Sequence, residues 1–115
     1  MTTSFKSTPS FRVFNFEGIE VRQVEDESRL YIYLTDVCRG LGQFIKRRGD
    51  TNSRYATTFI SHTNWISRTA EQLRFKGRPT FLVNRDGVRQ LADHVDTPRA
   101  HAFREWAERV VFNTV

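Results

Sequence analysis

The residues of this sequence that could do chemistry are mainly basic, and they gather in the middle third of the chain. Residues 39–78 hold nine Lys or Arg against two Asp or Glu, a net charge of +7. Residues 1–38 hold four against six, or −2, and residues 79–115 hold five of each, or zero. Clustered Lys and Arg neutralise phosphates and release counterions. The pattern predicts a phosphate-contacting surface in the middle segment, with a solvated charge run as the alternative.

The densest basic cluster is the run Lys46-Arg47-Arg48. Arg, Asn and Ser side chains are also types that can read base edges, although the sequence does not decide which of them reaches a groove. Lys76-Gly77-Arg78 is predicted as a loop, either an ordinary turn or a basic wing. Arg68 and Arg74 could instead pair with Glu71 on a shared helix. The predicted contact set is Arg39, Lys46, Arg47, Arg48, Asn52, Ser53, Arg54, Lys76 and Arg78.

Other chemistry has weak support in the sequence. Its histidines, His62, His94 and His101, do not share a metal-ligand spacing. The single cysteine, Cys38, excludes an internal disulfide and a multi-cysteine zinc site, and its apolar neighbours predict a buried residue. No Gly-rich phosphate loop and no paired acid and base are present. We therefore expect no enzyme activity, no metal and no cofactor.

Length and composition predict one domain with a modest core. The chain has 115 residues, ten of them Phe, and no apolar run near the roughly 18 residues that a membrane span needs. It shows no secretory signal, and one cysteine fits a reducing cytoplasm. The first ten residues are rich in Ser and Thr, so residues 1–10 are predicted to be a flexible tail and residues 11–115 the domain.

Alternating apolar residues predict strands in the first third of the chain. A hairpin is expected from Phe11–Phe16 and Ile19–Val24, turning at Glu17-Gly18 with help from Asn15. A third strand is expected at Leu30–Leu34. A short helix should follow, started by Thr35 or Asp36 and weakened at its end by Gly40 and Gly42.

The middle third gives weaker signals. Residues 44–48 are predicted to form one helical turn before Gly49, and Asn52 or Ser53 could start a helix containing Tyr55, Thr58 and Phe59. Trp65, Ile66, Thr69 and Leu73 fall near helical spacing, which predicts another helix there.

The last third gives the strongest signals. Thr80–Val83 is a predicted strand, and Asn84 can start a helix that buries Val88, Leu91 and Ala92. Thr97 and Pro98 then suit the start of a second helix. Its apolar face is formed by Phe103, Trp106, Ala107 and Val110. These elements together predict an α+β fold, a small and mainly antiparallel sheet packed by several helices.

Two ordered blocks of this sequence resemble the Bro-N domain, the N-terminal domain of the BRO family of phage antirepressors and related viral proteins. Residues 34–42 read Leu-Thr-Asp-Val-Cys-Arg-Gly-Leu-Gly, with residues 18–24, Gly-Ile-Glu-Val-Arg-Gln-Val, before them. Residues 83–91 read Val-Asn-Arg-Asp-Gly-Val-Arg-Gln-Leu, and residues 100–107 read Ala-His-Ala-Phe-Arg-Glu-Trp-Ala. The resemblance covers about residues 10–42 and 79–111, while the segment between them departs from the family's usual pattern.

The resemblance implies a Bro-N-like domain over residues 11–115 that binds double-stranded DNA in gene regulation of phage or prophage type. An alternative role for such a domain is an antirepressor that binds a repressor protein, for which exposed aromatic residues such as Phe44, Tyr55 or Trp65 would serve. Homodimer formation stays open, because DNA-binding domains often pair to match palindromic sites. The sequence also leaves open whether the chain is an excised domain or a single-domain relative.

Overall fold

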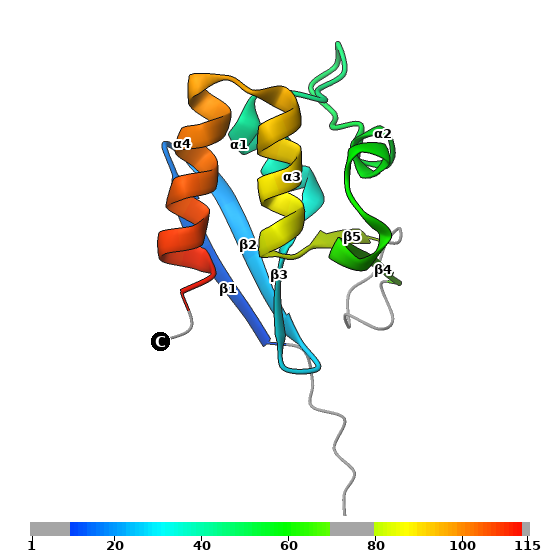
Figure 1. The fold of residues 1–115 in the computed structure, drawn as a ribbon, viewed down its shortest axis with the longest axis vertical. Coiled ribbons are helices and arrows are strands. Elements are labelled where there is room, and N and C mark those ends of the chain that lie inside the picture. Colours follow the sequence, from blue (N-terminus) through cyan, green and yellow to red (C-terminus); the bar gives the residue numbers. More distant parts are fainter. Residues whose placement is uncertain (1–9, 70–79, 114–115) are drawn as a thin grey trace, which may run out of the picture.

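The computed structural model describes residues 10–69 and 80–113, in which a five-stranded antiparallel sheet is covered on one face by helices (Figure 1). The strands are β1 (Ser10–Phe16), β2 (Ile19–Asp26), β3 (Arg29–Tyr33), β4 (Trp65–Arg68) and β5 (Thr80–Val83). Their order across the sheet is β1-β2-β3-β5-β4, and every neighbouring pair is antiparallel. The predicted α+β class is confirmed.

The helices are α1 (Leu34–Leu41), α2 (Ser53–Ala56), α3 (Arg85–Val95) and α4 (Pro98–Trp106). α2 continues into a 3₁₀ turn, Thr57–Phe59, and a second 3₁₀ turn, His62–Asn64, precedes β4. α4 continues into a π-helical segment, Ala107–Val111. α1, α3 and α4 lie over the sheet, and α2 lies beside them (Figure 1). None of the helices in the described ranges has the length and apolar content that crossing a membrane requires.

The first hairpin forms where the sequence predicts it. Phe16 pairs with Ile19, so Glu17 and Gly18 are the two residues of the turn, and both have positive φ angles of 51° and 89°. Such a turn has the twist that neighbouring strands need. The backbone N–H of Gly18 donates to Oδ1 of Asn15 at 2.9 Å, which confirms the expected contribution of Asn15.

The helix-covered face of the sheet holds the main core, with Phe103 of α4 near its centre. Phe103 is fully buried and packs edge-on against Phe16 of β1, with 5.1 Å between ring centroids. α1 crosses this ring at Gly40, where a Cβ atom would lie 2.3 Å from Cε1 of Phe103. Gly40 is therefore a contact point between two helices, whereas Gly42, with φ of 71°, ends α1 as predicted.

The opposite face of the sheet has a second apolar cluster. Val24, Tyr31, Tyr33 and Leu82 are buried there, with Ile66 packed against them. Because β3 is buried on both faces, its sequence reads as a nearly continuous apolar run rather than a clean alternation. The same cluster joins β4 to the sheet through Ile66.

The local signals at the starts of α3 and α4 are confirmed. Oδ1 of Asn84 accepts from the N–H of Gly87 at 2.8 Å, and Oγ1 of Thr97 accepts from the N–H of Ala100 at 3.1 Å. Pro98 occupies the first turn of α4. Of the predicted apolar face of this last helix, Phe103 and Ala107 are fully buried, and Trp106 and Val110 are partly buried.

Some sequence predictions are wrong, and others fall on residues outside the described ranges. Residues 65–68 form β4 instead of a helix, because Ile66 pairs with Leu82 in the sheet. α1 begins at Leu34, without a side-chain cap from Thr35 or Asp36. Of the expected N-terminal tail, residues 1–9 lie outside the described residues, and Ser10 begins β1. Leu73 also lies outside the described residues.

Candidate nucleic-acid interface

Residues 44–52, between α1 and α2, form a β-hairpin that projects from the body of the molecule, and we call it the basic hairpin (Figure 1). Ile45 and Thr51 form an antiparallel bridge, and the N–H of Lys46 donates to the carbonyl of Asp50 at 2.6 Å. The N–H of Gly49 donates to the carbonyl of Lys46 at 2.8 Å, and Gly49 has φ of 91°. A turn followed by a left-handed glycine is a common way to close a hairpin. The helical turn predicted for residues 44–48 is therefore wrong.

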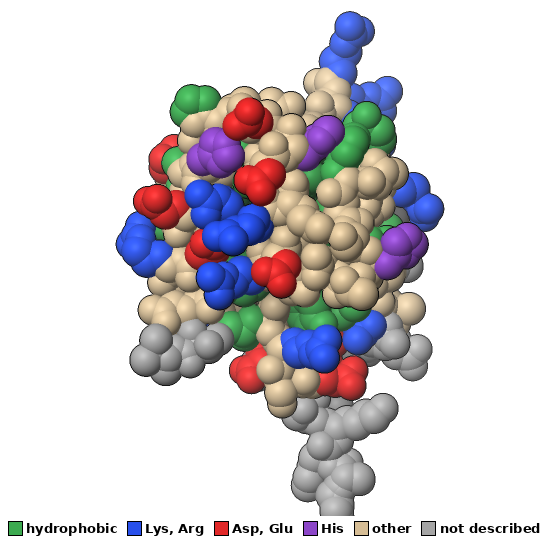
Figure 2. Space-filling model, viewed as in Figure 1, with side chains coloured by type: hydrophobic (Ala, Val, Ile, Leu, Met, Phe, Trp, Pro, Cys, Tyr) green, Lys and Arg blue, Asp and Glu red, His purple; other side chains and the backbone are tan. Residues whose placement is uncertain are grey.

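The densest basic run of the sequence lies at the tip of this hairpin. Lys46, Arg47 and Arg48 are all exposed, and Figure 2 shows Lys and Arg side chains gathered at the projecting end of the molecule. Within residues 10–69 and 80–113, none of these three side chains forms an ion pair with a carboxylate. Their charge is therefore available to a partner.

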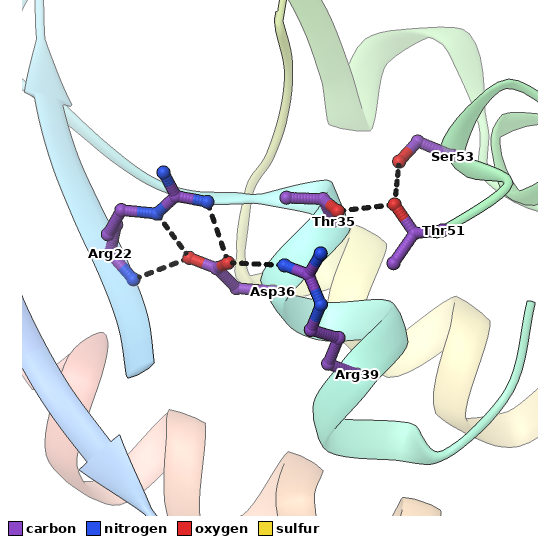
Figure 3. Close-up of polar contacts among 6 residues, drawn as sticks. All are labelled: Arg22, Thr35, Asp36, Arg39, Thr51 and Ser53. Atoms are coloured by element: carbon purple, nitrogen blue, oxygen red, sulfur yellow. Dashed lines mark hydrogen bonds and ion pairs between the residues drawn. The ribbon is translucent and has the colours of Figure 1, made fainter. Parts of the chain in front are cut away.

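Hydroxyl groups hold the basic hairpin against α1. Oγ1 of Thr51, on the returning strand of the hairpin, hydrogen-bonds to Oγ1 of Thr35 in the first turn of α1 (Figure 3). Thr51 also contacts Oγ of Ser53 at 3.3 Å, and Asn52 accepts from the N–H of Tyr55 at 3.4 Å at the start of α2. The sequence allowed either Asn52 or Ser53 to start this helix, and Asn52 is the cap of α2. Asn52 and Ser53, two of the five residues whose types could read base edges (with Arg47, Arg48 and Arg54), therefore help to position the hairpin.

Replacing Thr51 with valine is expected to loosen the basic hairpin. The change keeps the shape of the side chain but removes the hydrogen bond to Thr35, so the free energy of unfolding should fall by about 1 kcal/mol. Faster hydrogen exchange at the amides of Lys46 and Asn52 is expected as well, since both close the hairpin. The control is Thr63→Val, at an exposed position. Equal exchange rates in the two variants would contradict the anchoring role.

A partly buried ion pair between Arg22 and Asp36 fixes α1 on the sheet close to the hairpin. Asp36 is 2% exposed, and its carboxylate accepts from the backbone N–H of Arg22 at 2.8 Å and from Nε at 2.9 Å (Figure 3). The guanidinium also lies over the ring of Tyr33, at 4.1 Å from its centroid. The hydrogen bond to Asp36 raises the pKa of Arg22, and burial raises the pKa of Tyr33. Arg39 approaches the same carboxylate at 3.8 Å, so its charge is partly balanced.

The other basic residues of the middle segment do not all join the hairpin. Arg54, exposed on α2, lies over the ring of Phe81 at 6.0 Å. Arg68 donates to Asp26 at 2.8 Å and lies 3.5 Å from Glu27, near the turn between β2 and β3. The net charge of +7 is therefore divided between different parts of the molecule. Lys76 and Arg78, with the predicted basic loop, lie outside the described residues, as do Glu71 and Arg74.

Aromatic side chains form an open groove of about 610 Å³ beside the basic hairpin, and we call it the aromatic groove. Phe59 stacks on His94 with 3.7 Å between ring centroids, and Tyr55 packs edge-on against Phe59 at 5.1 Å. The groove is lined by Gln43, Phe44, Ile45, Lys46, Asn52, Tyr55, Phe59, His94 and Val95. Trp65, the third aromatic residue of interest in the sequence, packs against Phe81 instead. Sequence reasoning missed the groove because its lining comes from residues 43–59 and from residues 94–95, which are 35 to 52 residues apart.

Cys38 and the histidines have structural surroundings. Burial raises the pKa of the Cys38 thiol to about 12, so it stays protonated near neutral pH, and its predicted burial is confirmed. His101 contacts Asp96 at 2.8 Å, and His94 stacks on Phe59. In the part of the chain that the structure describes, no three His, Cys, Asp or Glu residues come together as metal ligands could.

Comparison with known proteins agrees with the fold and with the two blocks of sequence. The family model of the BRO family, N-terminal domain (Bro-N), matches residues 20–113, which is most of the chain. No curated protein and no solved structure shows a significant match. The family is associated with phage antirepressors and with DNA-binding regulators. The matched range includes the whole candidate interface, from α1 through the basic hairpin to the groove residues of α3. On this basis the chain belongs to the BRO family through its Bro-N domain.

Proposed function

We propose that this chain is a DNA-binding regulatory domain of phage or prophage type, a transcription regulator or antirepressor, whose basic hairpin contacts the phosphates of double-stranded DNA. The observation that carries the proposal is the exposure of Lys46, Arg47 and Arg48 at the tip of an anchored, projecting hairpin. Because no carboxylate of the described residues pairs with them, their charge is available for phosphates.

Two arginines on the helices before and after the hairpin in the chain extend the proposed surface. Arg39 lies in the last turn of α1 and Arg54 in α2, and both are exposed. In this arrangement Asn52 and Ser53 hold the hairpin in shape, and Arg47, Arg48 and Arg54 are the candidates for contacts with base edges. Lys76 and Arg78 remain part of the proposed set on their sequence alone.

The test is the triple charge reversal Lys46→Glu, Arg47→Glu and Arg48→Glu. Three phosphate contacts contribute about −2.7 to the salt slope, so the hairpin alone should make wild-type affinity fall about 40-fold between 50 mM and 200 mM salt. The variant should bind duplex DNA roughly 100-fold more weakly at the lower salt and show a flatter salt dependence, because repulsion replaces the contacts. Fluorescence anisotropy with a labelled duplex measures both quantities.

The matched control reverses three exposed arginines elsewhere, Arg29, Arg85 and Arg109, on β3, α3 and the C-terminal π-helical segment. It changes the net charge by the same amount. If it weakens binding as much as the hairpin variant does, only overall charge matters and the proposed surface is wrong. Wild-type affinity in the hairpin variant would exclude the hairpin as the contact.

A repressor-binding role is the second candidate, and its support is the exposed ring of Tyr55. Hot spots of protein interfaces are aromatic residues in desolvated pockets, and their contribution changes little with salt. Phe44 and Trp65 are partly buried against other rings, which leaves Tyr55 as the more accessible of the three. Steep salt dependence of binding to DNA in the titration above favours the DNA role over this one.

A further inference from the structure

The aromatic groove has features that the packing of the domain does not require. Tyr55 is 53% exposed although it is a large aromatic residue, and it forms one wall of the groove with Phe44, at 5.9 Å between ring centroids. Phe44 has a φ of 61°, a left-handed conformation that a bulky residue rarely adopts. Strained backbone of this kind often occurs at binding sites. In this conformation the ring of Phe44 lies 5.9 Å from the ring of Tyr55 and 5.8 Å from that of Phe59, between centroids.

The groove also combines flat rings with polar groups and a cation. Lys46 is among the lining residues, Gln43 and Asn52 supply amide groups, and His94 lines the groove stacked on Phe59. Oδ1 of Asn52 already accepts from the N–H of Tyr55, but an apolar peptide or a lipid chain would offer no partner to the NH2 groups of Gln43 and Asn52 or to the lysine. A planar, polar ring attached to a phosphate would use all of them, because rings stack on aromatic faces while amides bind ring edges.

We propose that the aromatic groove binds a single nucleobase whose own phosphate is held by Lys46 of the basic hairpin. This inference rests on the proposed function, since the hairpin brings the nucleic acid to the groove. The base could belong to a strand, as an unpaired or extruded nucleotide, or to a free mononucleotide. The volume of about 610 Å³ accommodates one base and its sugar.

The experiment compares three probes on the 115-residue chain. The first is an intact duplex, the second is the same duplex with one unpaired 2-aminopurine at its centre, and the third is dAMP. The bulged duplex should bind about tenfold more tightly than the intact one, near the lower end of what stacking of one base contributes. The 2-aminopurine fluorescence should be quenched on binding, because stacking quenches it.

The diagnostic variant is Tyr55→Ala, which removes an exposed ring from the groove. It should bind the intact duplex within about twofold of wild type, and its preference for the bulge should disappear. Phe11→Ala is the control, because Phe11 is also an aromatic residue with considerable exposure, 38%, but lies on β1 at the edge of the sheet. A melting curve for each variant shows whether the fold is kept.

The outcomes distinguish the proposed nucleobase site in the groove from the proposed DNA contact of the hairpin. A bulge preference that depends on Tyr55 assigns the groove to a base within a strand, whereas Tyr55-dependent binding of dAMP without that preference assigns it to a free nucleotide. Equal binding of the two duplexes, with no binding of dAMP, overturns the groove proposal and leaves the proposed DNA contact intact. Absence of salt-dependent binding to the intact duplex would instead contradict the proposed function.

Discussion

Replacing Phe103 with alanine is expected to lower the free energy of unfolding by about 3–5 kcal/mol. The ring is fully buried and fills the space between β1 and α1, in contact with Phe16 and Trp106. Truncation leaves a cavity that the surrounding helices cannot close, because interiors are packed as densely as crystals. Chemical denaturation measures the effect, with Phe11→Ala as the exposed aromatic control.

The contact between Phe103 and Gly40 can also be tested by adding a methyl group at Gly40 instead of removing the ring of Phe103. A methyl group at Gly40 would lie 2.3 Å from the ring of Phe103, so Gly40→Ala should destabilise by about 2 kcal/mol despite the better helix propensity of alanine. In a Phe103→Ala background the same change should become neutral or stabilising, because the methyl group then enters the cavity. Additive effects of the two changes would contradict the contact.

Helix starts in the last third were predictable because their signals are local. Asn84 and Thr97 each bond a backbone N–H three residues ahead, so the partner is fixed by the sequence itself. The apolar faces of α3 and α4 follow from spacing in the same way. The α+β class could be inferred because it depends only on the presence of these elements.

The basic hairpin and β4 were missed because they depend on distant partners. β4 has four residues, and its Ile66 pairs with Leu82 of β5, which lies 16 residues further along the chain. A pairing over this separation has no local signal. The hairpin depends on one bridge, on Gly49 in a left-handed conformation and on the contact of Thr51 with Thr35. Short apolar runs such as residues 44–45 have no periodicity that distinguishes a strand from a helix.

The candidate site was predictable only in part for a related reason. Counting charges located Lys46, Arg47 and Arg48, and the structure leaves all three exposed. Counting could not show that Arg68 is paired with Asp26, 42 residues away, or that Asp36 holds Arg22 across 14 residues. A sum of charges over a segment does not distinguish a neutralised residue from an available one.

Replacing Asp36 with alanine is expected to destabilise the domain by about 3 kcal/mol. The change leaves the backbone N–H of Arg22 without its acceptor and the guanidinium without its counter-charge. Removing one member of a buried pair typically costs 3–5 kcal/mol, and the lower end applies because the side chain of Arg22 is 38% exposed and can regain water. Asp93→Ala, at an exposed carboxylate of α3, is the control and should change stability by less than about 0.5 kcal/mol.

A double variant shows whether the carboxylate or the whole pair matters for stability. Combining Asp36→Ala with Arg22→Met removes the uncompensated charge and keeps an unbranched side chain over Tyr33, so part of the lost stability should return. No recovery would mean that the loss comes from the backbone N–H of Arg22 alone. Affinity for duplex DNA, measured well below the melting temperature, should change less than about threefold in either variant, because Asp36 is 2% exposed and Arg39, which it balances only weakly at 3.8 Å, keeps its own charge. A large loss of stability with a small change in affinity would distinguish the structural support that Asp36 gives to α1 from the proposed contact with DNA.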